Sequence, residues 1–305
     1  MIGIDPLMGY CNNRCSHCAY DSGPDREREE IDIDVLKDVI RQAVDLGCRH
    51  VQISGGGEPT LYSNFDELVT YLKELAEEGE EGHFSFSMFT NGWFVGSDME
   101  KSAEKFREYT KMGFNYIFVS DSQFHIEQNP NIKTFREAYG STIRDVGTLV
   151  FKNSVKEMDI NGLGRARTEL GITKSKCTGL FAIDDSMIVY PDGYYACCFH
   201  GFKFGELDEP LEKVVDKMKS DSFLNAMSVR DGDVFFLWLL GHYGERMEKE
   251  GLDCTPLDKI SKFDMCGACS LFLNDSQYSE ILKEASMEYL QNYLKDGIRK
   301  RSKIL

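Results

Sequence analysis

The chain has 305 residues, with 35 Lys and Arg against 51 Asp and Glu, a formal net charge of −16 at pH 7, and 42% hydrophobic residues. This length and apolar content are enough for one large domain and a smaller one with buried cores. The negative charge opposes binding to nucleic acid or to an anionic bilayer, so we expect neither as a partner. The sequence contains no apolar run of about 18 residues, and its first residues lack the pattern of a signal peptide, so we expect a cytoplasmic protein.

The first half of the chain alternates predicted helices and strands. Helical spacing of apolar residues predicts a helix over residues 31–46, and residues 50–54 form a short apolar strand that leads into glycines. The pattern continues with helices predicted over 64–76 and 99–112 and a further helix within 133–146. Strands are predicted over 84–89, 116–121 and 155–160. This alternation predicts βαβ units with right-handed crossovers and a parallel sheet.

The alternation stops near residue 165, and we place a domain boundary between residues 165 and 166. Residues 186–190 and 194–197 flank a Pro-Asp-Gly turn, which predicts a hairpin. Further helices are predicted over 211–219, 235–249 and 277–296.

Ten cysteines are many for a chain of this size, and in a reducing cytoplasm they do not form a stable disulfide framework. Cys11, Cys15 and Cys18 follow the first short strand with the spacing C-x3-C-x2-C. Three thiolates on one loop can hold three irons of a [4Fe–4S] cluster and leave the fourth iron without a protein ligand. A structural zinc site is the alternative, but it needs a fourth ligand, for which only His17 or His50 is near in the sequence.

The cysteine spacing resembles the cluster motif of the radical S-adenosylmethionine (SAM) superfamily, although the residue before the third cysteine is usually a hydrophobic aromatic and is His17 here. A second segment, Ile53-Ser-Gly-Gly-Gly-Glu-Pro-Thr-Leu61, follows a predicted strand and is similar to the family's GGEP segment, which lies against the SAM amino group. In this segment the residues implied to bind SAM are Gly55, Gly56, Gly57, Glu58 and Pro59. The glycines would let the backbone approach the ligand, and Glu58 would accept a hydrogen bond from the ammonium. Taken alone, glycines after a strand would also fit a plain turn.

The resemblance implies an α/β fold, a partial (β/α)6 TIM-like barrel over residues 1–165 that binds its ligands at the C-terminal ends of the strands. Asn91, Ser120 and Asp121 follow predicted strands and would face the same opening as cofactor-binding residues. The resemblance makes Ser120 a candidate for the SAM ribose or carboxylate. A strand-end cap or turn is the alternative role for each of the three.

Two further side chains belong to the predicted site. His125 would lie where substrate enters and would give or take a proton, although a structural histidine is the commoner case. Arg165, or next to it Arg167, would clamp a carboxylate of SAM or of substrate, with a surface ion pair as the alternative.

A second set of cysteines is similar to the auxiliary-cluster motif of the SPASM and shorter twitch extensions. The spacing C-x15-G-x4-C and a later C-x2-C pair imply four ligands for one auxiliary [4Fe–4S] cluster: Cys177, Cys198, Cys266 and Cys269. Because no cysteine follows Cys269, the resemblance is to the single-cluster twitch form, over residues 166–305 with its C-terminal helices. A zinc ribbon is the alternative, and Cys197 is a neighbouring candidate ligand that the glycine spacing does not select.

Cys254 belongs to neither set. By resemblance to radical SAM peptide epimerases, it would return a hydrogen atom to a substrate radical, and an inert cysteine is the alternative.

Together these motifs imply a radical SAM oxidoreductase or maturase that reductively cleaves SAM to a 5′-deoxyadenosyl radical, which takes a hydrogen atom from a substrate C–H bond. Segments 18–24 and 52–61 are similar to those of maturases of ribosomally made peptides, which favours a peptide substrate and a crosslinked or epimerised product. A dehydrogenase of an aminosugar or cyclitol is the small-molecule alternative. Outside the enzymes, a non-catalytic iron–sulfur or zinc protein is the alternative.

The same resemblance implies partners. An electron donor such as flavodoxin or ferredoxin would reduce the cluster. Because the predicted barrel starts close to Met1, a peptide substrate would need a separate leader-binding protein.

Overall fold

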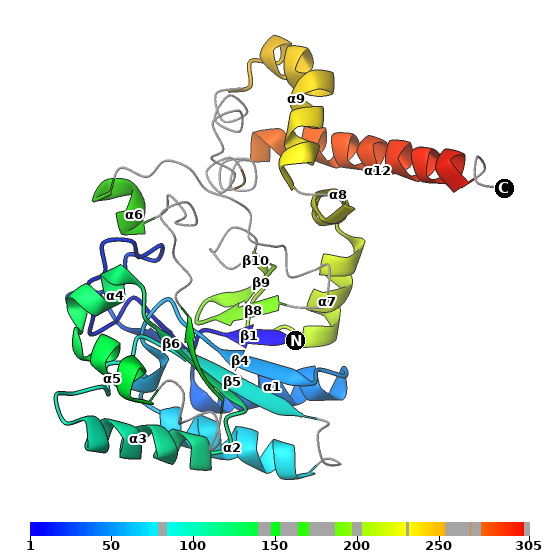
Figure 1. The fold of residues 1–305 in the computed structure, drawn as a ribbon. Coiled ribbons are helices and arrows are strands. Elements are labelled where there is room, and N and C mark those ends of the chain that lie inside the picture. The colour runs from blue at the N-terminus through cyan, green and yellow to red at the C-terminus, as the bar shows by residue number, and fades with distance from the viewer. Residues whose placement is uncertain are drawn as a thin grey trace.

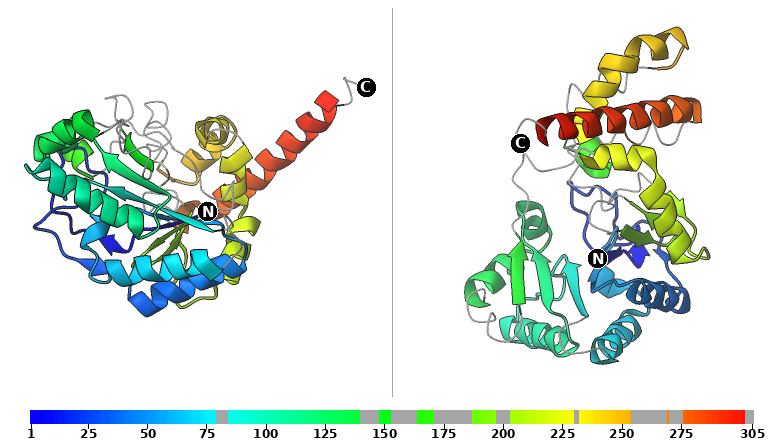
Figure 2. Two further views of the ribbon diagram at one scale, coloured as in Figure 1. Left: turned by 60° about the horizontal axis from the view of Figure 1, so that its bottom comes forward. Right: turned by 90° about the vertical axis from the view of Figure 1, so that its right-hand side faces the viewer.

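The computed structural model describes residues 1–78, 84–139, 148–152, 164–170, 187–196, 203–229, 232–253, 269 and 276–301. They form a curved, mostly parallel sheet with helices along its outer face, and a group of helices beyond one edge (Figures 1 and 2). The predicted mixed α/β fold with C-terminal helices is confirmed.

Five neighbouring parallel strands form one side of the sheet, and the last of them lies at its edge. They pair in the order β1 (Ile2–Ile4), β4 (His50–Ile53), β5 (Ser85–Thr90), β6 (Tyr116–Ser120) and β7 (Thr148–Lys152). Because all five run in the same direction, the loops that leave their C-terminal ends meet at one edge of the sheet.

Helices connect these strands, and most of them bury an apolar face in the same core as the strands. They are α1 (Ile33–Asp45), α2 (Phe65–Glu78), α3 (Met99–Lys111), α4 (Gln123–Gln128) and α5 (Asn131–Tyr139). In α1, Asp32 caps the first turn by accepting hydrogen bonds from the amides of Asp34 and Val35. The buried stripe of the same helix includes Leu36 and Val39, both fully buried, as the sequence periodicity predicts.

The predicted hairpin is confirmed, and it extends the central sheet. β8 (Met187–Tyr190) pairs in parallel with β1 and antiparallel with β9 (Gly193–Tyr195), which pairs with β10 (Lys203–Gly205). The sheet therefore continues past residues 165 and 166, and a domain boundary there stays a prediction. A small antiparallel sheet of β2 (Leu7–Met8) and β3 (Glu29–Glu30) closes the segment between them into a long loop.

The described helices of the C-terminal part are α6 (Gly164–Thr168), α7 (Leu211–Ser220), α8 (Ser222–Val229), α9 (Gly232–Lys249), α12 (Ser279–Arg301) and the short 3-10 helix η5 (Ser276–Tyr278). A 3-10 helix of the first half, η1 (Pro59–Leu61), follows β4. α7 packs against α1, whereas α12 packs on α8 and α9 and extends away from the sheet (Figure 1). In the described part of the chain, no helix is long and apolar enough to cross a membrane.

One predicted helix begins at another residue in the structure, and one predicted strand falls on residues that the structure does not describe. The strand that pairs with β6 is β7, at residues 148–152, whereas the strand predicted over 155–160 lies outside the described residues. The helix predicted within 133–146 corresponds to α5, which begins earlier, at Asn131. The intervening α4 is only six residues long, so it carries too little apolar periodicity to be predicted.

Candidate active site

A cavity of about 310 Å³ lies where the C-terminal ends of β4, β5 and β6 meet the loop that follows β2. Residues from these widely separated segments line it, among them Cys11, Cys15, His17, Cys18, Ser22, Gly55, Gly56, Gly57, Glu58, Pro59, Asn91, Ser120, His125 and Arg165. Most of the cofactor and cluster residues predicted from the sequence for the first half of the chain therefore surround one space.

The three cysteines of the first set all line this cavity. Cys15 is buried, and Cys11 and Cys18 are half-buried. The sulfur of Cys11 accepts hydrogen bonds from the amide of Asn13 and from Nδ2 of Asn91, and that of Cys18 accepts one from the amide of Ser22, each at 3.4 Å. Burial raises the pKa of the Cys11 thiol to about 11 and that of Cys15 to about 12. Metal binding would therefore displace protons from these thiols.

The glycine segment packs directly against the chain that carries the cysteines. A β-carbon on Gly56 would lie 2.2 Å from Sδ of Met8, and one on Gly57 would lie 2.4 Å from the carbonyl oxygen of Tyr10. The carbonyl of Gly56 accepts hydrogen bonds from the amide of Gly9, at 3.1 Å, and from the Ser22 hydroxyl. These glycines thus allow a close approach of two segments of the protein itself, in addition to lining the cavity.

Glu58 is 1% exposed, and its carboxylate accepts hydrogen bonds from other residues of the protein. One oxygen accepts hydrogen bonds from the hydroxyls of Thr60 and Thr90, at 2.6 and 2.7 Å, and the other accepts the amide of Asn91 at 2.7 Å. Burial raises the pKa of Glu58, and the hydrogen bonds act in the opposite direction. Because Asn91 also donates to Cys11, Glu58 helps to position a donor against a cysteine sulfur.

A buried acid that the sequence motifs do not include lies beside the glycine segment. Asp5 follows β1, is 1% exposed, and accepts a hydrogen bond of 2.6 Å from the Ser54 hydroxyl. Burial raises the pKa of Asp5 from 3.8 to about 7, although bonds from Ser54 and Gly56 lower it. The signal that could have found Asp5 is its position directly after a strand, the same signal that selected Asn91.

His17 and His125 line one side of the cavity, and Phe124 packs against His17. The ring of His17 stacks on Phe124 with centroids 4.5 Å apart and meets His125 edge-on at 5.0 Å. Nδ1 of His125 lies 2.7 Å from the Ser122 hydroxyl. Burial lowers the pKa of both imidazoles to about 4, so both are neutral near pH 7. The buried Nδ1 of His17 has no hydrogen-bond partner among the described residues.

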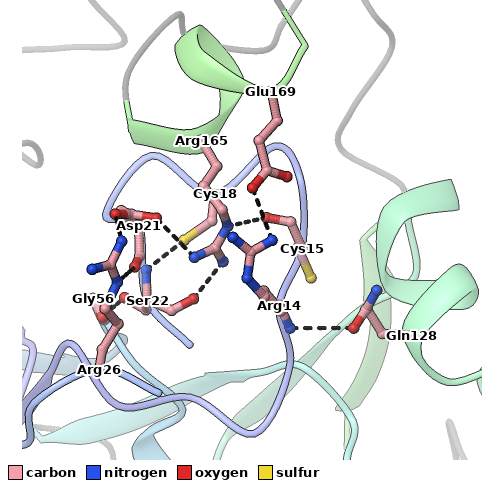
Figure 3. Close-up of polar contacts among 10 residues, drawn as sticks. All are labelled: Arg14, Cys15, Cys18, Asp21, Ser22, Arg26, Gly56, Gln128, Arg165 and Glu169. Carbon is pink, nitrogen blue, oxygen red and sulfur yellow. Dashed lines mark hydrogen bonds and ion pairs between the residues drawn. The ribbon is translucent and has the colours of Figure 1, made fainter. Parts of the chain in front are cut away.

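Ser120, Asp121 and Arg165, the other predicted site residues, have different surroundings. Ser120 lines the cavity. Asp121 is 2% exposed and pairs with Arg136 at 2.6 Å, and it is not among the residues that line this cavity. Arg165 lines the cavity, but its guanidinium group donates to Cys15 and Ser22 of the cysteine-bearing loop (Figure 3).

The second set of cysteines is not placed by the structure. Cys177, Cys198, Cys266 and Cys254 lie outside the described residues, and Cys269 is half-buried. The auxiliary cluster and the role of Cys254 therefore stay predictions.

The donor chemistry of the cavity fits an iron–sulfur cluster. Its three thiols come from one loop, and each thiolate of such a cluster binds a different iron. Among the described residues, no three His, Cys, Asp or Glu side chains are close enough to share a single metal ion. Of the two histidines that a zinc site would use, His50 has both ring nitrogens 2.8 Å from the hydroxyls of Ser85 and Ser87.

Comparisons with known proteins identify the segment that forms this cavity. Residues 6–122 match the sequence model of the radical SAM superfamily. A probable GTP 3′,8-cyclase from Archaeoglobus fulgidus is 34% identical over 98 residues, 32% of this chain and 28% of that protein. The mycofactocin maturase MftC from Mycolicibacterium smegmatis is 43% identical over 61 residues, 20% of this chain and 15% of that protein. The matches thus span less than a third of the length of these curated relatives.

A solved structure agrees at the level of the fold. The crystal structure of BtrN in complex with AdoMet and 2-DOIA has a TM-score of 0.52 and 17% identity, over 75% of this chain and 86% of that chain. At this identity the likeness concerns the fold alone.

Proposed function

We propose that the protein is a radical SAM enzyme, because residues 6–122 match the sequence model of the radical SAM superfamily. The observation that carries the proposal is the convergence of Cys11, Cys15 and Cys18 on one cavity with the glycine segment, at the C-terminal edge of a parallel sheet. The three thiols would hold a [4Fe–4S] cluster, and Gly55, Gly56, Gly57, Glu58, Pro59, Asn91 and Ser120 would border SAM. When bound, the cluster and SAM supply a 5′-deoxyadenosyl radical that takes a hydrogen atom from a substrate C–H bond.

The residues of the chain itself arrange and line this cavity. Asn91 donates to the Cys11 sulfur and is held in turn by Glu58, so a cluster ligand has a fixed hydrogen-bond donor. The rings of His17 and His125 line one side of the cavity, and Phe124 supports His17 by stacking on it. A neutral His125, anchored by Ser122, can accept or donate a hydrogen bond without adding charge near the radical chemistry.

The substrate proposal is a ribosomally made peptide, which would be crosslinked or epimerised. It is supported by the similarity of segments 18–24 and 52–61 to peptide maturases, and the match to the maturase MftC agrees with it. A small-molecule substrate is the second candidate, which the match to the GTP cyclases favours. The auxiliary cluster would decide whether the substrate radical is oxidised, and a thiol such as Cys254 would instead return hydrogen to it.

Anaerobic reconstitution tests the enzyme proposal. The protein given dithionite and SAM should release 5′-deoxyadenosine, Cys15→Ala should abolish this release, and Cys48→Ala should keep it. Cys48 is the matched control because its thiol is half-buried and donates to the carbonyl of His50, away from the cavity. Tightly bound zinc in place of iron, or no deoxyadenosine from the iron-loaded protein, would contradict the proposal.

Genomic neighbours and products separate the two substrate candidates. A short reading frame beside the gene, whose peptide changes mass on incubation with enzyme and SAM, would support the peptide. Genes for glycosyl or amino transfer, together with turnover of an aminosugar, would support the small molecule.

A further inference from the structure

The loop between β2 and β3, residues 9–28, carries all three cysteines and is called the cysteine loop below. It lies outside the strands of the central sheet, so its carbonyl groups accept hydrogen bonds from within the loop, as that of Cys15 does from the amide of Cys18, and from other parts of the chain. A cysteine ligand is placed only as well as the backbone that carries it. The groups that donate to this loop therefore bear on the geometry of the three sulfurs.

Arg165 reaches from α6 into the cysteine loop and supplies several of these donors (Figure 3). Its Nε donates to the carbonyl of Cys15 at 3.0 Å, its Nη2 donates to the carbonyl of Ser22, and its Nη1 pairs with the carboxylate of Asp21 at 2.9 Å. Its backbone amide also donates to the carbonyl of Cys18 at 2.9 Å. One residue thus contacts the loop at the second and third cysteines and just after the third.

The carboxylate that Arg165 binds belongs to a strained turn. Asp21 has a φ of +56°, the left-handed region, where it is the sole non-glycine residue among those described. Asp tolerates this conformation better than most residues, but it still needs support from its surroundings. Arg26 contacts the same carboxylate from the other side, so two guanidinium groups hold the turn between Cys18 and Ser22 (Figure 3).

The guanidinium of Arg165 is also a buried charge beside the cluster site. Arg165 is 2% exposed, and its guanidinium contacts the backbone of Cys15 directly. Charges act more strongly in a buried site than in water. Adding an electron to a cluster makes it more negative, so a nearby cation favours the reduced form.

We infer that Arg165 is a positioning residue for the cluster ligands, which fixes Cys15 and Cys18 through the loop backbone and favours reduction of the cluster by its charge. This inference rests on the proposed function for the presence of the cluster. It differs from the role predicted from the sequence, in which the guanidinium clamps a carboxylate of SAM or substrate, because three of its N–H groups are used by the cysteine loop.

The first test needs no metal. Hydrogen–deuterium exchange of the amides of residues 9–28 is compared in the metal-free wild-type protein and in Arg165→Lys, Arg165→Gln and Arg167→Gln. Arg167 is the matched control because it lies on the same helix and is exposed. Both Arg165 variants should exchange these amides about tenfold faster or more, and Arg167→Gln should not. Circular dichroism checks the fold, and Arg165→Lys carries the test if the glutamine variant does not fold.

The second test measures the reduction potential of the reconstituted cluster by a titration followed by electron paramagnetic resonance. Arg165→Gln should lower the equilibrium constant for reduction by about tenfold, which is 59 mV for one electron. Arg165→Lys keeps the charge and should stay close to the wild type, although it holds the loop less well.

Two outcomes separate the inference from the function on which it rests. Unchanged exchange and potential in both Arg165 variants, with or without a loss of SAM affinity, would overturn the inference and leave the proposed function intact. If the wild-type protein takes up no iron, the proposed function fails, whereas faster exchange in the Arg165 variants would still support the positioning of the loop.

Discussion

Asp5 gives a prediction whose size follows from the structure. The pKa of this buried carboxyl is raised from 3.8 to about 7 because burial outweighs the hydrogen bonds from Ser54 and Gly56. The folded chain then holds the proton more tightly than the unfolded chain, so the stability that Asp5 contributes is lost as pH rises from the unfolded to the folded pKa. Between pH 5.5 and pH 8 this one group should lower the free energy of unfolding by about 2 kcal/mol.

Urea unfolding of the metal-free protein at both pH values measures this loss. The wild type should lose about 2 kcal/mol more than Asp5→Asn over this interval, because asparagine does not titrate. Asp216→Asn is the matched control, since Asp216 is exposed on α7 and its substitution should leave the pH dependence of the wild type in place. Equal pH dependence in the wild type and Asp5→Asn would show that the hydrogen bonds cancel the effect of burial, and would refute the reasoning.

Three further substitutions test other parts of the site. Glu58→Gln should lower the free energy of unfolding at pH 8 by about 1–3 kcal/mol, because an amide cannot accept all the hydrogen bonds from Thr60, Thr90 and Asn91. Urea titration measures this free energy, and an unchanged value would contradict the prediction. Gly57→Ala should lower the free energy of unfolding by about 1–3 kcal/mol, and by more than Gly56→Ala does. The added β-carbon at Gly57 would meet backbone oxygens, whereas that at Gly56 would meet the flexible end of Met8. Melting temperatures in the reverse order would contradict this. Cys269→Ala should keep SAM cleavage and lose the product, as chromatography of deoxyadenosine and product would show; full turnover would exclude an auxiliary cluster ligand there.

The elements that the sequence predicts well are those with a long apolar stripe or a clear alternation. α1 and α3 lie within two residues of their predicted limits, since each buries one continuous face. β5 and β6 are found for the same reason, as apolar runs that end in polar residues. α4 is too short to show a helical period, and its position depends on the turn after Ser122.

The site was predictable as a set of residues but not as a set of contacts. The spacing of the cysteines suits a single iron–sulfur cluster, so Cys11, Cys15 and Cys18 could be grouped by sequence alone. The partners of Arg165 are backbone carbonyls, and a sequence carries no direct signal for where the carbonyls of a loop point. Asp121 follows a strand as Asn91 does, yet its carboxylate pairs with Arg136 of α5.

The buried polar groups at this edge of the sheet connect segments that are far apart in the chain. Asp5 and Ser54 join the ends of β1 and β4, and Glu58 joins the segment after β4 to the end of β5 through Asn91. Asn91 in turn donates to the sulfur of Cys11 in the cysteine loop. A buried polar group that loses its partner cannot bind water instead, so any arrangement that breaks one of these hydrogen bonds costs free energy. Each hydrogen bond therefore stabilises the observed arrangement of the segments. The position of the Cys11 sulfur therefore depends on Asn91, which donates to it, and through Asn91 on Glu58, which follows β4.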